Sequence, residues 1–111
     1  MSSIGGNCDL RLLKKTGDVV NSIGEKVEKW DNYMTIRGYL DLSSGSSFRE
    51  TYNSKVQESS HIFICDYVEI TEKKVKNLKA ECNGKEFDVL LIDNPMELNQ
   101  HLEIFLKYIG D

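Results

Sequence analysis

The sequence predicts a small, mainly β domain. Its 111 residues suit one compact domain with a single core. Three observations favour strands over helices. Apolar and polar residues alternate over residues 8–12 and 33–42, apolar residues occupy both parities of 60–70, and a turn dipeptide separates two further alternating stretches.

In the first predicted strand, Cys8, Leu10 and Leu12 alternate with polar residues. The segment 14–18, Lys-Lys-Thr-Gly-Asp, is rich in turn residues and is expected to end this strand. The weakly patterned stretch 19–29 that follows is expected to be a loop or a hairpin.

The clearest alternation runs over residues 33–42. Gly38 falls on its apolar parity, where a missing side chain indicates a bulge or a close backbone approach. Trp30, just before this strand, is expected to anchor the core. The other residues of the apolar parity are Met34, Ile36, Leu40 and Leu42.

Residues 43–57 are expected to form a long flexible loop. The loop begins with a patch of small polar residues, 43–47, and continues without a useful period. About fifteen residues without structure of their own are uncommon between strands, and such loops are usually functional or disordered. A linker between domains is the alternative, although neither flank is long enough to be a domain.

From Ser60 to Ile70 the chain is apolar on both parities. Such a strand is either central in the fold or covered by a partner. One parity holds Ile62, Ile64, Val68 and Ile70, and the other holds Phe63, Cys65 and Tyr67.

A β-hairpin is predicted over residues 75–82 and 85–92. Asn83-Gly84 between them supplies the two positive φ angles of a type I′ turn. Leu78, Ala80 and Cys82 share one face of the first arm, and Phe87, Val89 and Leu91 share one face of the second.

The pattern at the C-terminus fits two structures. Asn94-Pro95-Met96-Glu97 resembles a helix start, and a helical stripe could follow it to Gly110. Yet residues 102–108 also alternate as a strand would. Periodicity alone does not decide between the two.

Composition narrows the classes of function. Fourteen Lys and Arg against eighteen Asp and Glu give a net charge of −4, which argues against strong non-specific binding to nucleic acid. No apolar run approaches the roughly 18 residues of a membrane helix. Residues 1–7 are expected to be frayed and lack the features of a signal peptide, so synthesis in the cytoplasm is expected.

Catalytic and metal chemistry find little support. His61 and Cys65 lie four apart with Cys82 further on, but four residues of a strand span about 13 Å, too far for two ligands of one ion. Cys65 as a nucleophile would need a base and an orienting carboxylate that no motif indicates. No enzyme activity, metal or cofactor is expected, and the cysteines, including Cys8, suit a reducing compartment.

Two features of the sequence are compatible with binding of nucleic acid, and each also has a simpler structural interpretation. The basic cluster could contact phosphates or an acidic partner, whereas a solvated edge strand protected by lysines is favoured. The aromatic residues Tyr39, Phe63 and Tyr67 could form the stacking platform of an oligonucleotide-binding barrel, but core or interface positions are commoner. The basic cluster comprises Lys73, Lys74, Lys76 and Lys79.

The order of these features resembles the phage head–tail joining family, also called head-closure or head-completion proteins. A turn with Gly24 leads to Trp30 and a strand with Tyr39, as in the opening hairpin of the family. After a long polar loop comes His61-Ile62-Phe63-Ile64. The remainder is similar at Asn83-Gly84-Lys85-Glu86-Phe87-Asp88-Val89, at Ile92-Asp93-Asn94-Pro95-Met96-Glu97-Leu98-Asn99 and at Leu102-Glu103-Ile104-Phe105-Leu106.

The resemblance implies a small antiparallel β-barrel or sandwich of about six strands with long loops. It implies at most one helical turn at Met96 to Asn99, then a strand from about His101. The loop becomes a candidate assembly segment that orders against neighbouring copies. Its candidate residues are Ser43, Ser44, Gly45, Ser46, Ser47, Phe48, Arg49 and Glu50, and the candidate inter-subunit strand comprises Ile62, Phe63, Ile64 and Tyr67.

The function that the resemblance implies is that of a virion structural protein without a catalytic site. Such a protein is made in the bacterial host cytoplasm, is a monomer when free, and assembles as a ring, twelvefold in related connectors. The implied partners are other copies, the portal or adaptor ring, and the tail terminator or other tail proteins. DNA would pass only transiently through the channel, and no membrane is involved. An oligonucleotide-binding β-barrel is the alternative.

Overall fold

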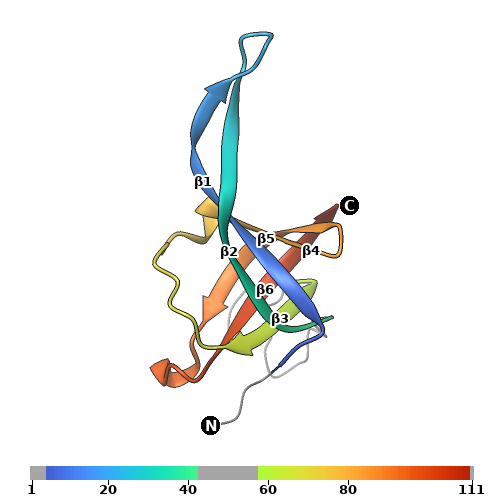
Figure 1. Cartoon of the computed structure of the whole chain (residues 1–111), viewed down its shortest axis with the longest axis vertical. Coiled ribbons are helices and arrows are strands. Elements are labelled where there is room, and N and C mark those ends of the chain that lie inside the picture. The colour runs from blue at the N-terminus through green and yellow to red at the C-terminus, as the bar shows by residue number, and fades with distance from the viewer. Residues whose placement is uncertain (1–4, 43–57, 111) are drawn as a thin grey trace.

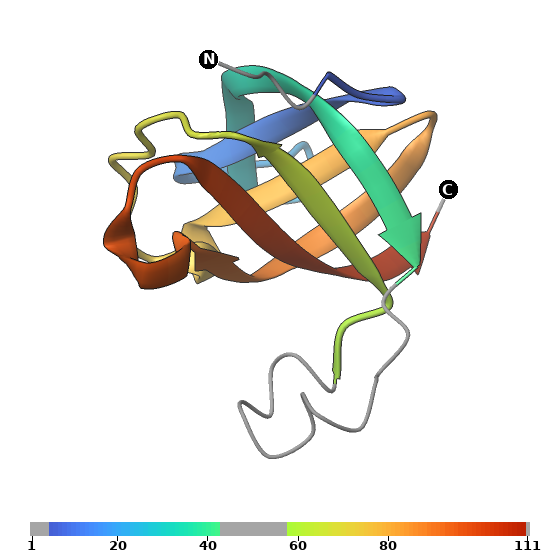
Figure 2. The same ribbon diagram turned by 90° about the horizontal axis from the view of Figure 1, so that it is seen from below.

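The computed structural model describes residues 5–42 and 58–110. Its strands all pair antiparallel in the order β1-β2-β3-β6-β5-β4, and the sheet closes on itself as an irregular barrel (Figures 1 and 2). This confirms the predicted mainly β fold of about six strands. The strands are β1 (Cys8–Val20), β2 (Lys26–Leu42), β3 (His61–Asp66), β4 (Leu78–Cys82), β5 (Lys85–Asp93) and β6 (His101–Gly110).

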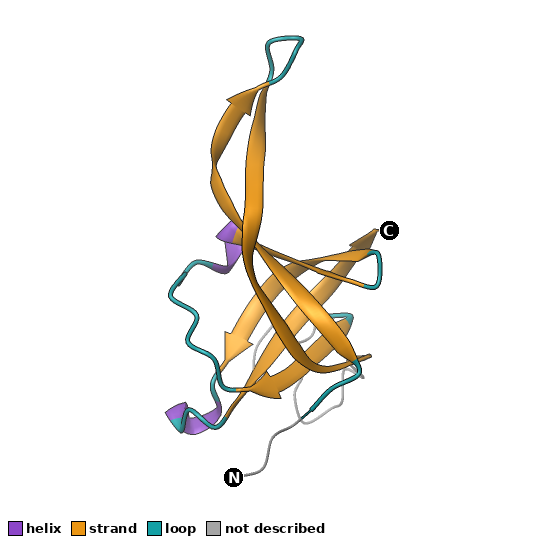
Figure 3. Ribbon diagram, viewed as in Figure 1, coloured by secondary structure: helices purple, strands orange, loops and turns teal. Residues whose placement is uncertain are grey.

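Short 3-10 turns join some of these strands. They are η1 (Val75–Asn77), before β4, and η2 (Pro95–Glu97), between β5 and β6 (Figure 3). No helix in the described part of the chain has the length and hydropathy needed to cross a bilayer.

Every strand contributes inward-facing apolar side chains to one core. Because side chains alternate along a strand, each strand lines the interior with every second residue. Phe63, Phe87 and Leu106 are fully buried there. The core comprises Cys8, Leu10, Leu12, Ile36, Phe63, Cys65, Leu78, Ala80, Cys82, Phe87, Val89, Leu102, Ile104 and Leu106.

The first strand does not end at residues 14–18, so that prediction is wrong. Lys15 pairs with Trp30 and Gly17 pairs with Lys29, which leaves Thr16 as an extra residue in a β-bulge. The Gly17 φ of 145° belongs to this irregularity. A bulge and a turn both favour glycine and small polar residues, so the local sequence does not separate them.

Beyond the bulge, β1 and β2 leave the barrel together as a two-stranded projection, here called the arm (residues 15–30). Figure 1 shows the arm rising from the barrel. Of the two alternatives for residues 19–29, the hairpin is therefore correct. The side-chain oxygen of Asn21 accepts hydrogen bonds from the backbone N–H groups of Ile23 (3.1 Å) and Glu25 (2.9 Å) at the turn.

The stretch 60–70 is only partly a strand. Of the two alternatives, a central strand or one covered by a partner, the structure shows a central strand, because β3 pairs with β2 on one side and with β6 on the other. The strand ends at Asp66, however, and Tyr67, Val68 and Ile70 pack against the core from an extended connection. The prediction of a strand through Ile70 is therefore wrong.

The Asn83-Gly84 hairpin is confirmed, with φ angles of 54° and 78°. The first arm begins later than predicted, because residues 75–77 form η1 instead of strand. The pairing of β1 with β4 stops at Lys14 and Leu78, where the arm leaves the barrel. Residues before Leu78 therefore have no partner in β1.

The C-terminal segment is a strand, as the family resemblance implied. Pro95–Glu97 forms one 3-10 turn and β6 runs from His101. Asn94 does not cap this turn with its side chain. Its Oδ1 instead accepts the backbone N–H of Asn99 at 3.1 Å, which closes the turn before a helix can continue.

Candidate interaction surfaces

His61, Cys65 and Cys82 are the side chains that the sequence analysis considered for metal or nucleophilic chemistry. No cluster of three metal-ligating side chains occurs among residues 5–42 and 58–110. His61 packs edge-to-face against Phe87 with 5.0 Å between ring centroids. Its Nδ1 lies 2.9 Å from the Ser60 hydroxyl. Burial, and secondarily the charge of Lys85, lowers the pKa of His61.

The cysteines are free and buried in the core. Burial raises the pKa of Cys65 to about 11, and burial together with contact with Cys82 raises that of Cys8 to about 12. Because the thiolate is the nucleophile, these thiols are held in their unreactive form near neutral pH.

The predicted inter-subunit strand presents its residues to different surroundings. Phe63 is fully buried inside the barrel. Ile62 and Ile64 lie on the other face of β3, in a small apolar cluster with Phe105 and Leu91. Tyr67 lies beyond the strand. A role of this strand between subunits stays a prediction.

Tyr39, Phe63 and Tyr67 do not form the stacking platform that was weighed against core or interface positions. Tyr39 is exposed, but Phe63 has no accessible surface and cannot stack on a base. The candidate assembly loop, Ser43 to Glu50, lies outside the described residues.

The four lysines do not mark an edge strand, which corrects the favoured interpretation. β4 pairs with β1 on one side and with β5 on the other. Lys73 and Lys74 are exposed in the connection before β4, and Lys76 is exposed in η1. Only Lys79 belongs to β4, and its ammonium nitrogen lies 4.8 Å from the centre of the Trp30 ring.

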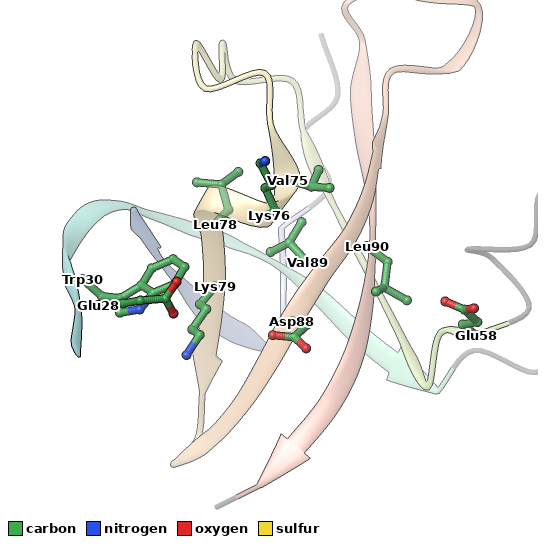
Figure 4. Close-up of a pocket in the computed structure, with 10 residues that line it drawn as sticks. All are labelled: Glu28, Trp30, Glu58, Val75, Lys76, Leu78, Lys79, Asp88, Val89 and Leu90. Atoms are coloured by element: carbon green, nitrogen blue, oxygen red, sulfur yellow. The ribbon is translucent and has the colours of Figure 1, made fainter. Parts of the chain in front are cut away.

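The prediction that Trp30 anchors the core is wrong. It is half-buried at the base of the arm and lines a groove of about 360 Å³ (Figure 4). Trp30 and Glu28 from β2 face Lys79 from β4 across part of this groove. The whole lining comprises Glu28, Trp30, Glu58, Val75, Lys76, Leu78, Lys79, Asp88, Val89 and Leu90.

The outer end of the arm, here called the tip (residues 18–27), exposes an apolar surface. Val19 and Val27 are directly opposite each other in the pairing of β1 with β2. Ile23 is 75% exposed and Val20 is 66% exposed. The sequence analysis missed this surface, and its signal was the presence of three valines and an isoleucine in the weakly patterned stretch 19–29.

A second apolar surface lies in the η2 turn, away from the arm (Figure 1). Met96 is 86% exposed and Leu98 is 56% exposed. Met96, Glu97 and Asn99 all have φ between 54° and 56°. Such angles are unfavourable for residues other than glycine, and they recur at functional turns.

A closed antiparallel sheet with exposed apolar projections defines a small β domain suited to protein contacts. Residues 1–108 match the family model described as phage head completion protein. The chain therefore belongs to the phage head completion protein family. No curated protein matches it.

The fold is also similar to a solved structure, the solution structure of protein SF1141 from Shigella flexneri 2a. The TM-score is 0.61 at 14% identity, over 97% of this chain and 96% of the other. At this identity the likeness establishes the shared fold alone.

Proposed function

We propose that this head completion protein is one subunit of a ring at the joint between phage head and tail. The ring lies below the portal or adaptor, retains the packaged DNA and provides the surface on which the tail docks. Free copies are monomers that are made in the host cytoplasm and become part of the virion on assembly.

The observation that carries this proposal is the separation of the two exposed apolar surfaces. The tip and the η2 turn project from different ends of the barrel (Figure 1). A ring subunit needs contacts with neighbours in its ring and with the rings above and below. Two separate apolar projections, Ile23 on one and Met96 on the other, suit that requirement.

The charge of the protein agrees with a channel through which DNA slides. The net charge is −4, and a channel that releases DNA has no use for tight phosphate binding. Twelvefold symmetry is the stoichiometry that we propose for the assembled ring.

The test is electron microscopy of lysates from a parent phage with a nonsense codon early in this reading frame. We expect separate tails beside tailless heads that have lost DNA, and rescue by the intact chain supplied in trans. Complete, infectious particles without the protein would refute the proposal.

A further inference from the structure

We propose that neighbouring copies in the ring are joined by insertion of the tip of one arm into the groove at the base of the arm of the next copy. This inference rests on the proposed function. The occupant of the groove is thus a second copy of this chain. The contact joins two different surfaces, so it is head-to-tail, which is the type of contact that can close into a ring.

Within the described residues, no apolar surface covers the exposed side chains of Val20 and Ile23 at the tip. An isolated two-stranded ribbon is at best marginally stable in water, and apolar residues at its end add no core. Salt bridging of Lys15 with Glu28 at 2.9 Å and the Thr16–Asp31 hydrogen bond support the inner part of the arm. Neither contact covers Val20 or Ile23. Both side chains would lose exposed apolar surface on docking.

The groove offers an apolar surface of matching kind. Val75, Val89 and Leu90 line it together with the half-buried ring of Trp30. The tip of the same chain cannot reach this groove. At about 3.4 Å per residue, the tip lies roughly 20 Å beyond Trp30 along the arm. That reach is comparable with the smaller dimensions of the molecule, 31 and 25 Å, so it suits an adjacent copy.

Charges of both signs lie beside the two apolar surfaces. Glu25 and Lys26 are adjacent and exposed at the tip, with Asp18 at its inner end. The charged residues of the groove lining are Lys76, Lys79, Glu28, Glu58 and Asp88 (Figure 4). In one orientation of the tip Glu25 faces a lysine of the groove and Lys26 faces a carboxylate, which favours that orientation over its reverse.

Paired cysteine substitutions test this contact in assembled particles. The double variant Ile23→Cys, Lys76→Cys places one exposed thiol at the tip and one at the groove. The matched control, Ile23→Cys with Met96→Cys, keeps the tip thiol and moves the second to the η2 turn. Particles carrying either variant are treated with a mild thiol oxidant and examined by non-reducing electrophoresis.

We expect the groove variant to give a ladder of dimers, trimers and larger species, at least tenfold stronger than the control. A ladder requires two different contact sites on each copy, whereas contact between two tips gives dimers only. Dimers alone, or equal ladders in the two variants, would overturn the arm-to-groove contact but leave the head completion role intact.

Absence of the wild-type protein from particles would instead refute the proposed function. The same oxidation of the purified chain at high concentration then decides the arm-to-groove contact alone. A preferential ladder would uphold the contact, and no preference over the control would reject it.

Discussion

Gly38 lies directly between Cys8 and Cys65, since β2 pairs Gly38 with Cys8 of β1 on one side and with Cys65 of β3 on the other. A Cβ atom at Gly38 would come within 2.9 Å of the Cys65 Cβ and within 2.7 Å of the Phe63 ring. The side chain is therefore missing where three strands meet above the core.

Gly38→Ala is expected to destabilise the protein by about 1–3 kcal/mol, the usual range for an overpacked core. The single tryptophan, Trp30, allows the free energy of unfolding to be measured by fluorescence in urea. Thr35→Ala, at an exposed position of the same strand, is the control and should change stability by less than about 0.5 kcal/mol. Equal stabilities for the two variants would contradict the close approach.

Tyr33→Phe is expected to loosen the connection between β3 and η1. The Tyr33 hydroxyl accepts the backbone N–H of Thr71 at 3.0 Å and lies 2.9 Å from its Oγ1. Loss of these bonds should cost about 1 kcal/mol and speed amide hydrogen exchange at Thr71 and Glu72. Tyr39→Phe, at an exposed tyrosine, should change neither quantity.

Protonation of His61 should lower the free energy of unfolding in mildly acidic solution. Burial lowers its pKa in the folded protein below the ordinary value of about 6.5. The unfolded chain therefore binds a proton more readily than the folded chain, so the stability that the neutral ring contributes is present above pH 6.5 and decreases as the pH falls below it.

The measurement is the free energy of unfolding between pH 8 and pH 5 for the natural chain and for His61→Gln. The difference between the two should change with pH only below about 6.5. Carboxylates with lowered pKa values, such as Glu28 and Glu72, act in both proteins and at lower pH. A difference independent of pH would show that the ring titrates alike in both states.

The core thiols should resist modification. The pKa values of about 12 for Cys8 and about 11 for Cys65 leave few thiolates at pH 8. A colorimetric disulfide reagent is expected to react slowly with the native protein and to label three cysteines in denaturant. Ile23→Cys adds an exposed thiol at the tip, which should react at once. Rapid labelling of the native natural chain would mean that the core opens readily.

Local sequence signals predicted most of the barrel. The Asn83-Gly84 turn needs two residues that tolerate positive φ, and alternation over residues 33–42 sets which side chains face inward. Both are decided by residues adjacent in the chain. The C-terminal strand was different, because its pattern fitted a helix equally well and only the family resemblance favoured a strand.

The arm and its groove could not be predicted in this way. Residues 14–18 are compatible with a turn or with a bulge, and the choice depends on whether Lys29 and Trp30 are available opposite them. Trp30 has the large apolar side chain of a typical core residue. It nevertheless lies outside the barrel beside Lys79, which is distant in the sequence. Neither the pairing of residues 14–18 nor the contact of Trp30 with Lys79 can be inferred from a few adjacent residues of the sequence.

The sequence by itself determined the fold class and the tight turn of the last hairpin, since side-chain alternation and backbone preference act over a few residues. Tertiary structure alone decided where β1 stops pairing with β4, and hence that two strands continue beyond the barrel as an arm. Strand pairing depends on residues distant in sequence, so the exposed apolar surface of the arm appears only when the sheet has closed.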